Sequence, residues 1–304
     1  MKKHLVLLFT LITFAFAQAQ DYKTVTYFAN DTLKLEMDVF MPKVKGKEKL
    51  PLVVHVHGGG FSGGERSSDR DFTKKAAEQG FVAANITYTL YMKGKSFSCD
   101  GKLPEKIKAI QIAANQLQLA VIYFLKNESY NIDPAKVFIS GSSAGAETVL
   151  HAAFWDNKML SMYADSLPAN FKYAGVISGA GAIMDLNLIT PKNLIPVFLF
   201  HGSCDTTVPY GTAAHHYCPP NSPGWLMLFG SYSVYNHVIG LKGNTKLVTY
   251  CGGGHDYSAE LFHKDPQQIV DFMKGVLNGE KQQSHTIMAT GKECQKYAEY
   301  EFCR

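Results

Sequence analysis

Short apolar runs alternate along the chain with segments in which apolar residues recur every three or four positions. The first two runs, 21–29 and 32–40, alternate apolar and polar residues around the turn residues Asn30 and Asp31, a pattern typical of an antiparallel hairpin. Later runs are mostly apolar, as expected of strands that a parallel sheet buries on both faces. These runs cover residues 50–56, 81–88, 137–139, 173–178, 196–202 and 246–250. The run at 246–250 is expected to be the last strand of the chain.

Segments of helical periodicity lie between these strands. The longest begins near Pro104, a residue favoured in the first turn of a helix, and continues to about Asn127. Shorter ones cover 69–79, the residues after Ala144, and 266–277. Because strands alternate with helices, we predict one α/β domain over residues 20–280, doubly wound around a mostly parallel sheet of about eight strands.

A sharp turn follows the strand at 137–139. Gly141-Ser142-Ser143-Ala144-Gly145 fits the pattern G-x-S-x-G between a strand and a helix. Such a turn strains the serine backbone and exposes its hydroxyl at the carboxyl edge of the sheet, where a Cβ at either glycine would clash. We therefore interpret Ser143 as a nucleophile. Since glycine and serine are common in ordinary turns, this interpretation needs partner residues elsewhere in the chain.

Three other strand ends carry residues that could serve as partners. A glycine run, His57-Gly58-Gly59-Gly60-Phe61, follows the strand at 50–56, Asp205 follows that at 196–202, and His255 follows that at 246–250. Catalytic groups in open α/β sheets gather beyond the carboxyl ends of the strands. We therefore predict a catalytic triad in which His255 takes the proton of Ser143 and Asp205 orients the imidazole.

The glycine run after His57 leaves backbone N–H groups free to bind a ligand, which suits an oxyanion hole. Gly58, Gly60 and Gly63 also have the spacing of a dinucleotide-binding loop. That alternative expects an acidic residue at the end of the next strand, where the chain instead has Thr87-Tyr88-Thr89. The oxyanion interpretation is therefore the stronger one.

Taken together, the glycine run, the serine turn and the order Ser143, Asp205, His255 resemble the α/β-hydrolase superfamily. Within it they are similar to HGGG-type carboxylesterases and lipases, which include hormone-sensitive-lipase-like and feruloyl-esterase-like enzymes. The resemblance covers about residues 24–278 and implies an α/β-hydrolase fold without a metal or organic cofactor. It also implies that the N–H groups of Gly59, Gly60 and Ala144 form the oxyanion hole.

One stretch departs from the family pattern. About fifty residues separate Asp205 from His255, more than a minimal α/β-hydrolase fold needs. The excess lies at 213–243. The sequence leaves open whether this segment forms a cap over the pocket or a surface helix that packs its own aromatic residues.

Other polar residues near these motifs have ordinary structural interpretations. His55 and His201 are expected to pack in the core and at a strand end. Adjacent residues do not share a helix face, so the pair His215-His216 is expected to be solvated rather than metal-binding. Asp185 is a fallback for the acid of the triad, and Glu147 is expected to be structural.

Composition and the amino terminus place the chain among exported globular proteins. A hydrophobic content of 46% and a net charge of +4 exclude a disordered chain and a strongly basic nucleic-acid-binding protein. Residues 1–19 combine a basic start, an apolar run too short to span a bilayer, and Ala17-Gln18-Ala19, as in a cleaved signal peptide. We expect a periplasmic or extracellular protein that is not inserted in a membrane.

Cysteine usage agrees with that compartment, because none of the six cysteines has zinc-binding spacing and disulfides form in oxidising spaces. Cys294 and Cys303 lie close together in the polar tail at 281–304 and are expected to pair with each other. Three pairings remain open for the other four cysteines, which are Cys99, Cys204, Cys218 and Cys251.

The function expected from these features is that of a secreted serine carboxylic-ester hydrolase. Its substrate would be a small-molecule or polysaccharide-linked ester, with short-chain acyl, acetyl and feruloyl esters as candidates by family analogy. Two alternatives remain. One is a serine peptidase of the prolyl-oligopeptidase type, although no propeller domain precedes the hydrolase region. The other is a non-catalytic, hydrolase-like binding protein, although all three triad residues are present. The oligomeric state is left open.

Overall fold

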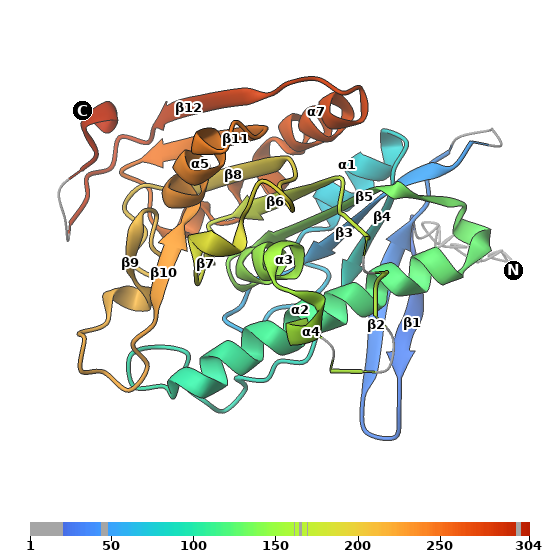
Figure 1. Cartoon of the computed structure of the whole chain (residues 1–304), viewed down its shortest axis with the longest axis horizontal. Coiled ribbons are helices and arrows are strands. Elements are labelled where there is room, and N and C mark those ends of the chain that lie inside the picture. The colour runs from blue at the N-terminus through green and yellow to red at the C-terminus, as the bar shows by residue number, and fades with distance from the viewer. Residues whose placement is uncertain (1–20, 44–47, 161, 164–165, 169, 296–298) are drawn as a thin grey trace, which may run out of the picture.

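A nine-stranded sheet crosses the molecule in the computed structural model, with helices on both of its faces (Figure 1). The structure describes residues 21–43, 48–160, 162–163, 166–168, 170–295 and 299–304, so the predicted signal peptide lies outside the described residues. The strands of the sheet are β1 Lys23–Ala29, β2 Lys34–Phe40, β3 Leu50–Val56, β4 Val82–Ile86, β5 Ile132–Ser142, β6 Gly175–Gly179, β8 Val197–Gly202, β11 Thr245–Cys251 and β12 Gln283–Ala289.

The strand order is β1-β2-β4-β3-β5-β6-β8-β11-β12. β1 and β2 form the predicted antiparallel hairpin at one edge, and β2 runs antiparallel to β4. All other neighbours in the sheet are parallel. The carboxyl ends of β3, β5, β8 and β11 therefore lie along one edge of the sheet, as the predicted site requires.

Both faces of the central strands are buried. In β3, Leu52 and Val54 belong to one apolar core and Val53 to the other, because successive side chains of a strand point to opposite faces. The helices that contribute to the first core are α2 Leu103–Lys126, α3 Ala144–Phe154, α4 Asn157–Leu160 and α5 Ser231–Gly240. Those that contribute to the second are α1 Arg70–Glu78, α6 Glu260–Lys264 and α7 Pro266–Leu277.

A second, smaller sheet lies beside the carboxyl edge of the large one. It has the order β7-β10-β9, and its strands are antiparallel. Its members are β7 Ala182–Ile183, β9 Thr212–Ala214 and β10 Met227–Gly230. Short 3₁₀ helices complete the described structure at Glu128–Tyr130, Leu186–Leu188, His215–Tyr217, His255–Tyr257 and Glu301–Cys303.

The prediction that 246–250 is the last strand is wrong. β12 follows α7 and pairs in parallel with β11, from Thr245 opposite Gln283 to Cys251 opposite Ala289. Most side chains of β12 are exposed, so the strand has none of the buried apolar pattern that marks the central strands. Part of the expected polar tail is thus an edge strand of the sheet.

The predicted pairing of Cys294 with Cys303 is also wrong. The disulfides join Cys99 to Cys218, Cys204 to Cys294 and Cys251 to Cys303, and no cysteine is free among the described residues. β12 carries the segment after it along β11, so each tail cysteine reaches a different strand end of the large sheet. Proximity in the sequence did not reveal this, because the path of the strand decides which sulfurs meet.

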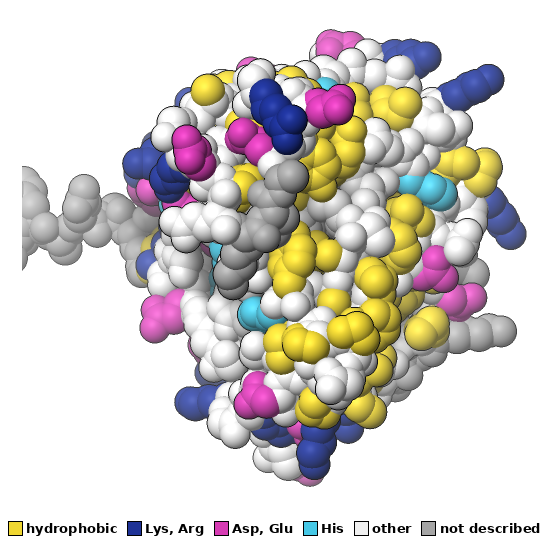
Figure 2. Space-filling view, turned by 90° about the vertical axis from the view of Figure 1, so that its left-hand side faces the viewer, with side chains coloured by type: hydrophobic (Ala, Val, Ile, Leu, Met, Phe, Trp, Pro, Cys, Tyr) yellow, Lys and Arg dark blue, Asp and Glu magenta, His cyan; other side chains and the backbone are white. Residues whose placement is uncertain are grey.

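Figure 2 shows the side of the molecule that carries the small sheet and the carboxyl terminus. Acidic and basic side chains are interspersed on this face, and neither sign forms an extended patch among the described residues. None of the helices that the structure describes combines the length and the apolar composition needed to span a bilayer.

Candidate active site

The turn between β5 and α3 holds Ser143 in a strained conformation. Its φ and ψ are 52° and −120°, a combination that costs a non-glycine residue about 1–3 kcal/mol. The surrounding packing fixes it, since Ser143 N–H donates to Gly179 O over 2.8 Å. A Cβ at Gly145 would lie 2.0 Å from Val56 O, and one at Gly141 would lie 2.4 Å from the Gly145 carbonyl. The two glycines are therefore required for the turn to form.

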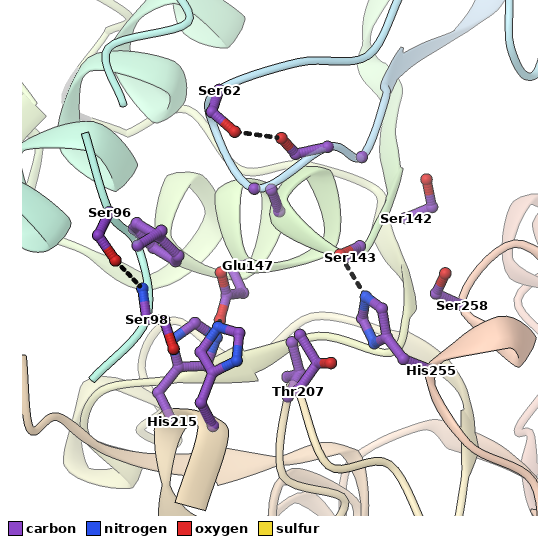
Figure 3. Close-up of a pocket in the computed structure, with 17 residues that line it drawn as sticks. Ser62, Ser96, Ser98, Ser142, Ser143, Glu147, Thr207, His215, His255 and Ser258 are labelled. Atoms are coloured by element: carbon purple, nitrogen blue, oxygen red, sulfur yellow. Dashed lines mark hydrogen bonds and ion pairs between the residues drawn. The ribbon is translucent and has the colours of Figure 1, made fainter. Parts of the chain in front are cut away.

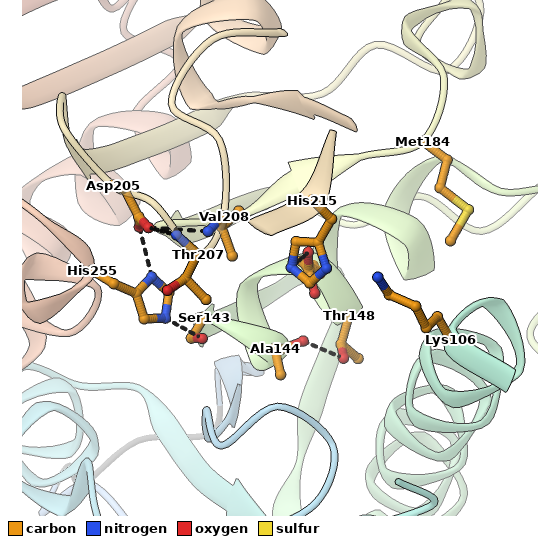
Figure 4. Close-up of polar contacts among 12 residues, drawn as sticks. Lys106, Ser143, Ala144, Thr148, Met184, Asp205, Thr207, Val208, His215 and His255 are labelled. Atoms are coloured by element: carbon orange, nitrogen blue, oxygen red, sulfur yellow. Dashed lines mark hydrogen bonds and ion pairs between the residues drawn. The ribbon is translucent and has the colours of Figure 1, made fainter. Parts of the chain in front are cut away.

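The structure brings Ser143, His255 and Asp205 into one hydrogen-bonded chain (Figures 3 and 4). Ser143 Oγ lies 2.7 Å from His255 Nε2, and His255 Nδ1 lies 2.6 Å from Asp205 Oδ2. The three residues follow β5, β11 and β8, which places them at the carboxyl edge of the sheet. This geometry allows the imidazole to take the serine proton while the carboxylate faces its other nitrogen.

Asp205 is fully buried and held on both of its oxygens. The N–H groups of Thr207 and Val208 donate to Oδ1 over 2.7 and 3.0 Å. Burial by itself would raise the pKa of Asp205, but hydrogen bonds with His201 and His255 hold it well below its usual range. The carboxylate is therefore charged at neutral pH and can stabilise an imidazolium at position 255.

His201 has a larger part in the site than the sequence predicted. It is buried at the end of β8, as expected, but its Nε2 also lies 3.1 Å from Asp205 Oδ2. Its Nδ1 lies 2.9 Å from Ser231 Oγ on α5. His201 and His255 thus face the same oxygen of Asp205, and His201 helps to hold that carboxylate in place. Its spacing of four residues before Asp205 is the only sequence signal that could have revealed this contact.

The glycine run after β3 forms one side of the site. Gly59 and Gly60 have φ values of 117° and 59°, and a Cβ at Gly59 would lie 2.2 Å from Gly63 O. Gly58, Gly59 and Gly60 line the same cavity as Ser143 and Ala144. The loop does not open a helix directly, because α1 begins only at Arg70. This arrangement disfavours the dinucleotide-binding alternative.

A cavity of about 540 Å³ lies in front of Ser143 (Figure 3). It is lined by the glycine run, the triad serine and histidine, Phe97, Val208 and many polar side chains. The polar side chains away from the triad include Ser62, Ser96, Ser98, Glu147, His215 and His216.

The expectation of a solvated His215-His216 pair is wrong. His215 is only 2% exposed, and both rings line the cavity. Burial lowers the pKa of each imidazole, that of His216 to about 4. The local fold explains the difference, because β9 and the turn at 215–217 direct the chain into the cavity. Among the described residues, no group of three His, Cys, Asp or Glu side chains could hold a metal ion.

His55 and Asp185 are two further polar residues whose predicted roles can be compared with the structure. His55 is a core residue as predicted, 1% exposed, with Ser140 Oγ 3.0 Å from Nδ1 and Asp69 Oδ2 2.9 Å from Nε2. Asp185 is exposed and caps a 3₁₀ helix by accepting from Asn187 N–H. It therefore has no part in the triad geometry that the structure shows.

The segment 213–243 divides into two parts. α5 packs on β8 and β11 of the large sheet, and its Tyr232 ring stacks on Tyr210 with centroids 5.4 Å apart. The residues before β10 instead form a wall of the cavity, with the His215 ring 5.1 Å from that of Phe97. The disulfide between Cys99 and Cys218 joins the two loops that carry these rings.

Replacing Cys99 and Cys218 together by serine should loosen this wall. The two residues are 119 positions apart, and closing a loop of that length stabilises a protein by roughly 4–5 kcal/mol in the chain-entropy account. We expect a lower Tm and a KM for ester substrates that rises severalfold, with kcat changed less because the triad stands on other elements. Steady-state kinetics well below the variant's Tm would test this. An unchanged KM would contradict a role of the disulfide in shaping the cavity.

Known proteins resemble this chain over part of its sequence. A family model described as BD-FAE matches residues 37–193. Gut esterase 1 of Caenorhabditis elegans is 30% identical over 135 residues, which make up 42% of this chain and 22% of that protein. Juvenile hormone esterase of Tribolium castaneum is 26% identical over 153 residues, or 50% of this chain and 23% of that protein. The chain thus spans under a quarter of the length of these curated relatives.

Solved structures support the fold over most of the chain. The propionate-bound structure of a thermophilic esterase, Est2 of Thermogutta terrifontis, superposes with a TM-score of 0.59 at 16% identity. The match covers 85% of this chain and 95% of that one. A paraoxon-phosphorylated structure of the same esterase matches with a TM-score of 0.58 at 15% identity. At these identities the likeness concerns the fold alone, which is that of an α/β-hydrolase.

Proposed function

Because this chain belongs to the BD-FAE family of α/β-hydrolases, we propose that it is a serine carboxylic-ester hydrolase that acts through an acyl-enzyme. The observation that carries this proposal is the continuous hydrogen-bonded chain from Ser143 through His255 to Asp205. Resemblance to known esterases supports it over part of the sequence. In the proposal, Ser143, His255 and Asp205 are the catalytic residues, and the N–H groups of Gly59, Gly60 and Ala144 form the oxyanion hole.

The reaction would begin with attack of Ser143 Oγ on the ester carbonyl carbon. His255 Nε2 takes the hydroxyl proton as the new bond forms, and the oxyanion-hole N–H groups bind the carbonyl oxygen as it becomes negative. The bond to the alcohol oxygen then breaks, and that oxygen receives the proton from His255. Water attacks the acyl carbon in the same way, which releases the acid and restores the Ser143 hydroxyl.

The dimensions and lining of the cavity bear on the substrate. A cavity of about 540 Å³ that combines Phe97 and Val208 with many polar side chains can hold a small acyl group or an aromatic one with polar substituents. Acetyl and feruloyl esters, free or attached to polysaccharide, are the proposed classes. Two solved structures of similar fold carry propionate and butyrate, which are acids with short chains, as acetate is.

Export is the remaining part of the proposal. Three disulfides are typical of proteins from oxidising compartments, and residues 1–19 have the pattern of a signal peptide. We therefore place the enzyme in the periplasm or outside the cell, with one hydrolase domain that extends beyond the predicted end at residue 280 to include β12. In this proposal, residues 213–243 supply a wall of the cavity and a helix on the sheet rather than a separate mobile cap.

Assays of p-nitrophenyl acetate and of an alanyl-proline p-nitroanilide on one preparation would separate esterase from peptidase. We expect kcat/KM on the ester to exceed that on the anilide by at least about 10³, since esters are the substrate class of the proposed function. Comparable turnover of the anilide would favour the peptidase alternative. Turnover of neither compound would favour the non-catalytic binding protein.

A further inference from the structure

Two buried polar atoms in the cavity lack partners. Glu147 Oε1 and His215 Nδ1 have no hydrogen-bond partner among the described residues, although the two side chains are only 1% and 2% exposed. Buried polar atoms are nearly always hydrogen-bonded, because an unpaired one costs about 1–3 kcal/mol. The two side chains face each other with His215 Nε2 3.6 Å from Glu147 Oε1, which is too long for a hydrogen bond. Their arrangement is thus incomplete without another group.

The position of this pair relates it to the candidate nucleophile. Glu147 follows Ser143 by four residues on α3, which places it about one turn, or roughly 6 Å, further along the helix axis. Glu147 lies on the side of Ser143 that is away from His255 in Figure 3, and His215 does so in Figures 3 and 4. Both side chains line the same cavity as the triad. A substrate whose ester carbonyl lies at Ser143 could therefore reach them with a group several bonds away.

The charges around Glu147 and His215 indicate which kind of substrate group could bind between them. Lys106 is buried on α2, donates from Nζ to Gly224 O over 2.7 Å, and interacts electrostatically with Glu147. Burial raises the pKa of Glu147 to about 8, although the Lys106 ammonium lowers it, and burial lowers the pKa of His215. At neutral pH the pair is thus a carboxylic acid beside a neutral imidazole, so one partner donates and the other accepts.

A neutral hydroxyl group matches this pair better than an ion does. A cationic substrate group would be repelled by the Lys106 ammonium, and an anionic one would lose its hydration beside side chains that are only 1% and 2% exposed. A hydroxyl can donate one hydrogen bond and accept another, so it could bond to the pair whichever partner donates and whichever accepts.

We propose that Glu147 and His215 form a subsite for a hydroxyl group that the ester substrate carries several bonds from its carbonyl. This inference rests on the proposed ester hydrolysis and goes beyond it by naming the residues that distinguish hydroxylated from unsubstituted esters. The hydroxyl could belong to the acyl group or to the alcohol. The experiment below therefore includes a pair of substrates for each.

Two matched pairs of esters test the subsite. Methyl 6-hydroxyhexanoate and methyl heptanoate differ by a hydroxyl in place of a methyl on the acyl side, and 4-hydroxybutyl acetate and pentyl acetate differ likewise on the alcohol side. The measured quantity is the kcat/KM ratio of the hydroxylated ester to its partner, in the wild type and in variants. Comparing this ratio between enzymes cancels the intrinsic reactivities of the esters.

In one of the two pairs, we expect Glu147→Leu to lower the ratio by about tenfold, because it removes one hydrogen bond to the hydroxyl. Glu147→Gln, which keeps a donor and an acceptor, should retain most of the ratio. His215→Phe should lower it like Glu147→Leu. The control Glu128→Leu changes an exposed carboxylate outside the cavity and should keep the wild-type ratio.

The outcomes separate this proposal from the one on which it rests. If the kcat/KM ratio is the same in Glu147→Leu, His215→Phe and the wild type for both pairs of esters, the subsite proposal is overturned. The proposed ester hydrolysis would still stand. If Glu147→Gln lowers the kcat/KM ratio as much as Glu147→Leu does, a hydrogen bond to the hydroxyl is not the cause. That result would also contradict the subsite proposal. Failure of the wild type to hydrolyse any of the four esters would instead overturn the proposed function.

Discussion

Replacing Ser143 by alanine is expected to abolish ester hydrolysis. Ser143 Oγ is the atom that His255 Nε2 faces over 2.7 Å, and without it no covalent acyl-enzyme can form. Loss of a triad nucleophile lowers kcat by about 10⁵–10⁶. The residual rate would come from the oxyanion hole and substrate binding alone. Turnover of p-nitrophenyl acetate by the purified variant, against the uncatalysed rate, measures the effect.

The neighbouring serine provides a matched control for this variant. Ser142 also lines the cavity, but it is the last residue of β5, one position before the strained turn residue. We expect Ser142→Ala to lose less than about tenfold in kcat, since its hydroxyl has no part in the proton transfer. If Ser143→Ala stays active and Ser142→Ala does not, the nucleophile has been assigned to the wrong serine.

Replacing Asp205 by asparagine is expected to lower kcat by about 10⁴ with little change in KM. The carboxylate accepts from Thr207 and Val208 through Oδ1 and faces His255 Nδ1 through Oδ2. An amide of the same shape keeps the packing, but it holds His255 in the wrong tautomer and cannot stabilise the imidazolium. Steady-state kinetics on an activated ester, together with a Tm to show that the variant is folded, measures the effect.

Asp185→Asn is the control for the acid. Asp185 is exposed and bonds to the backbone and side chain of Asn187, so its variant should keep the wild-type kcat. An Asp205→Asn variant with a near-normal rate would show that the buried carboxylate only supports the fold. The account would then lack an acid, because the structure places no other carboxylate against His255 among the described residues.

The central strands and the serine turn could be predicted because local rules govern them. Buried parallel strands need uninterrupted apolar runs, and β3 Leu50–Val56 has the predicted bounds. The turn at Ser143 needs glycine on both sides, which the Cβ contacts at Gly141 and Gly145 bear out. Parallel strands also bring their carboxyl ends together, so the meeting of Ser143, Asp205 and His255 followed from the order of the elements.

The features that sequence reasoning missed depend on packing between distant segments. β12 is an exposed edge strand, so its residues carry no buried apolar pattern. The partner of Cys294 is set by where β12 takes the chain, not by the nearby Cys303. His215 looks like a surface residue until the disulfide of Cys218 places its loop against Phe97. In each case the decisive contact joins residues that no local rule relates.

The most direct test of the central claim is labelling of the full-length, disulfide-bonded protein with a fluorophosphonate, followed by peptide mass spectrometry. These reagents phosphonylate a serine only when a neighbouring base activates it, so they report the working triad rather than the mere presence of its residues. The account predicts a single phosphonylated residue, Ser143, and loss of labelling in the Asp205→Asn variant. An unlabelled protein, or a label on another serine, would contradict it.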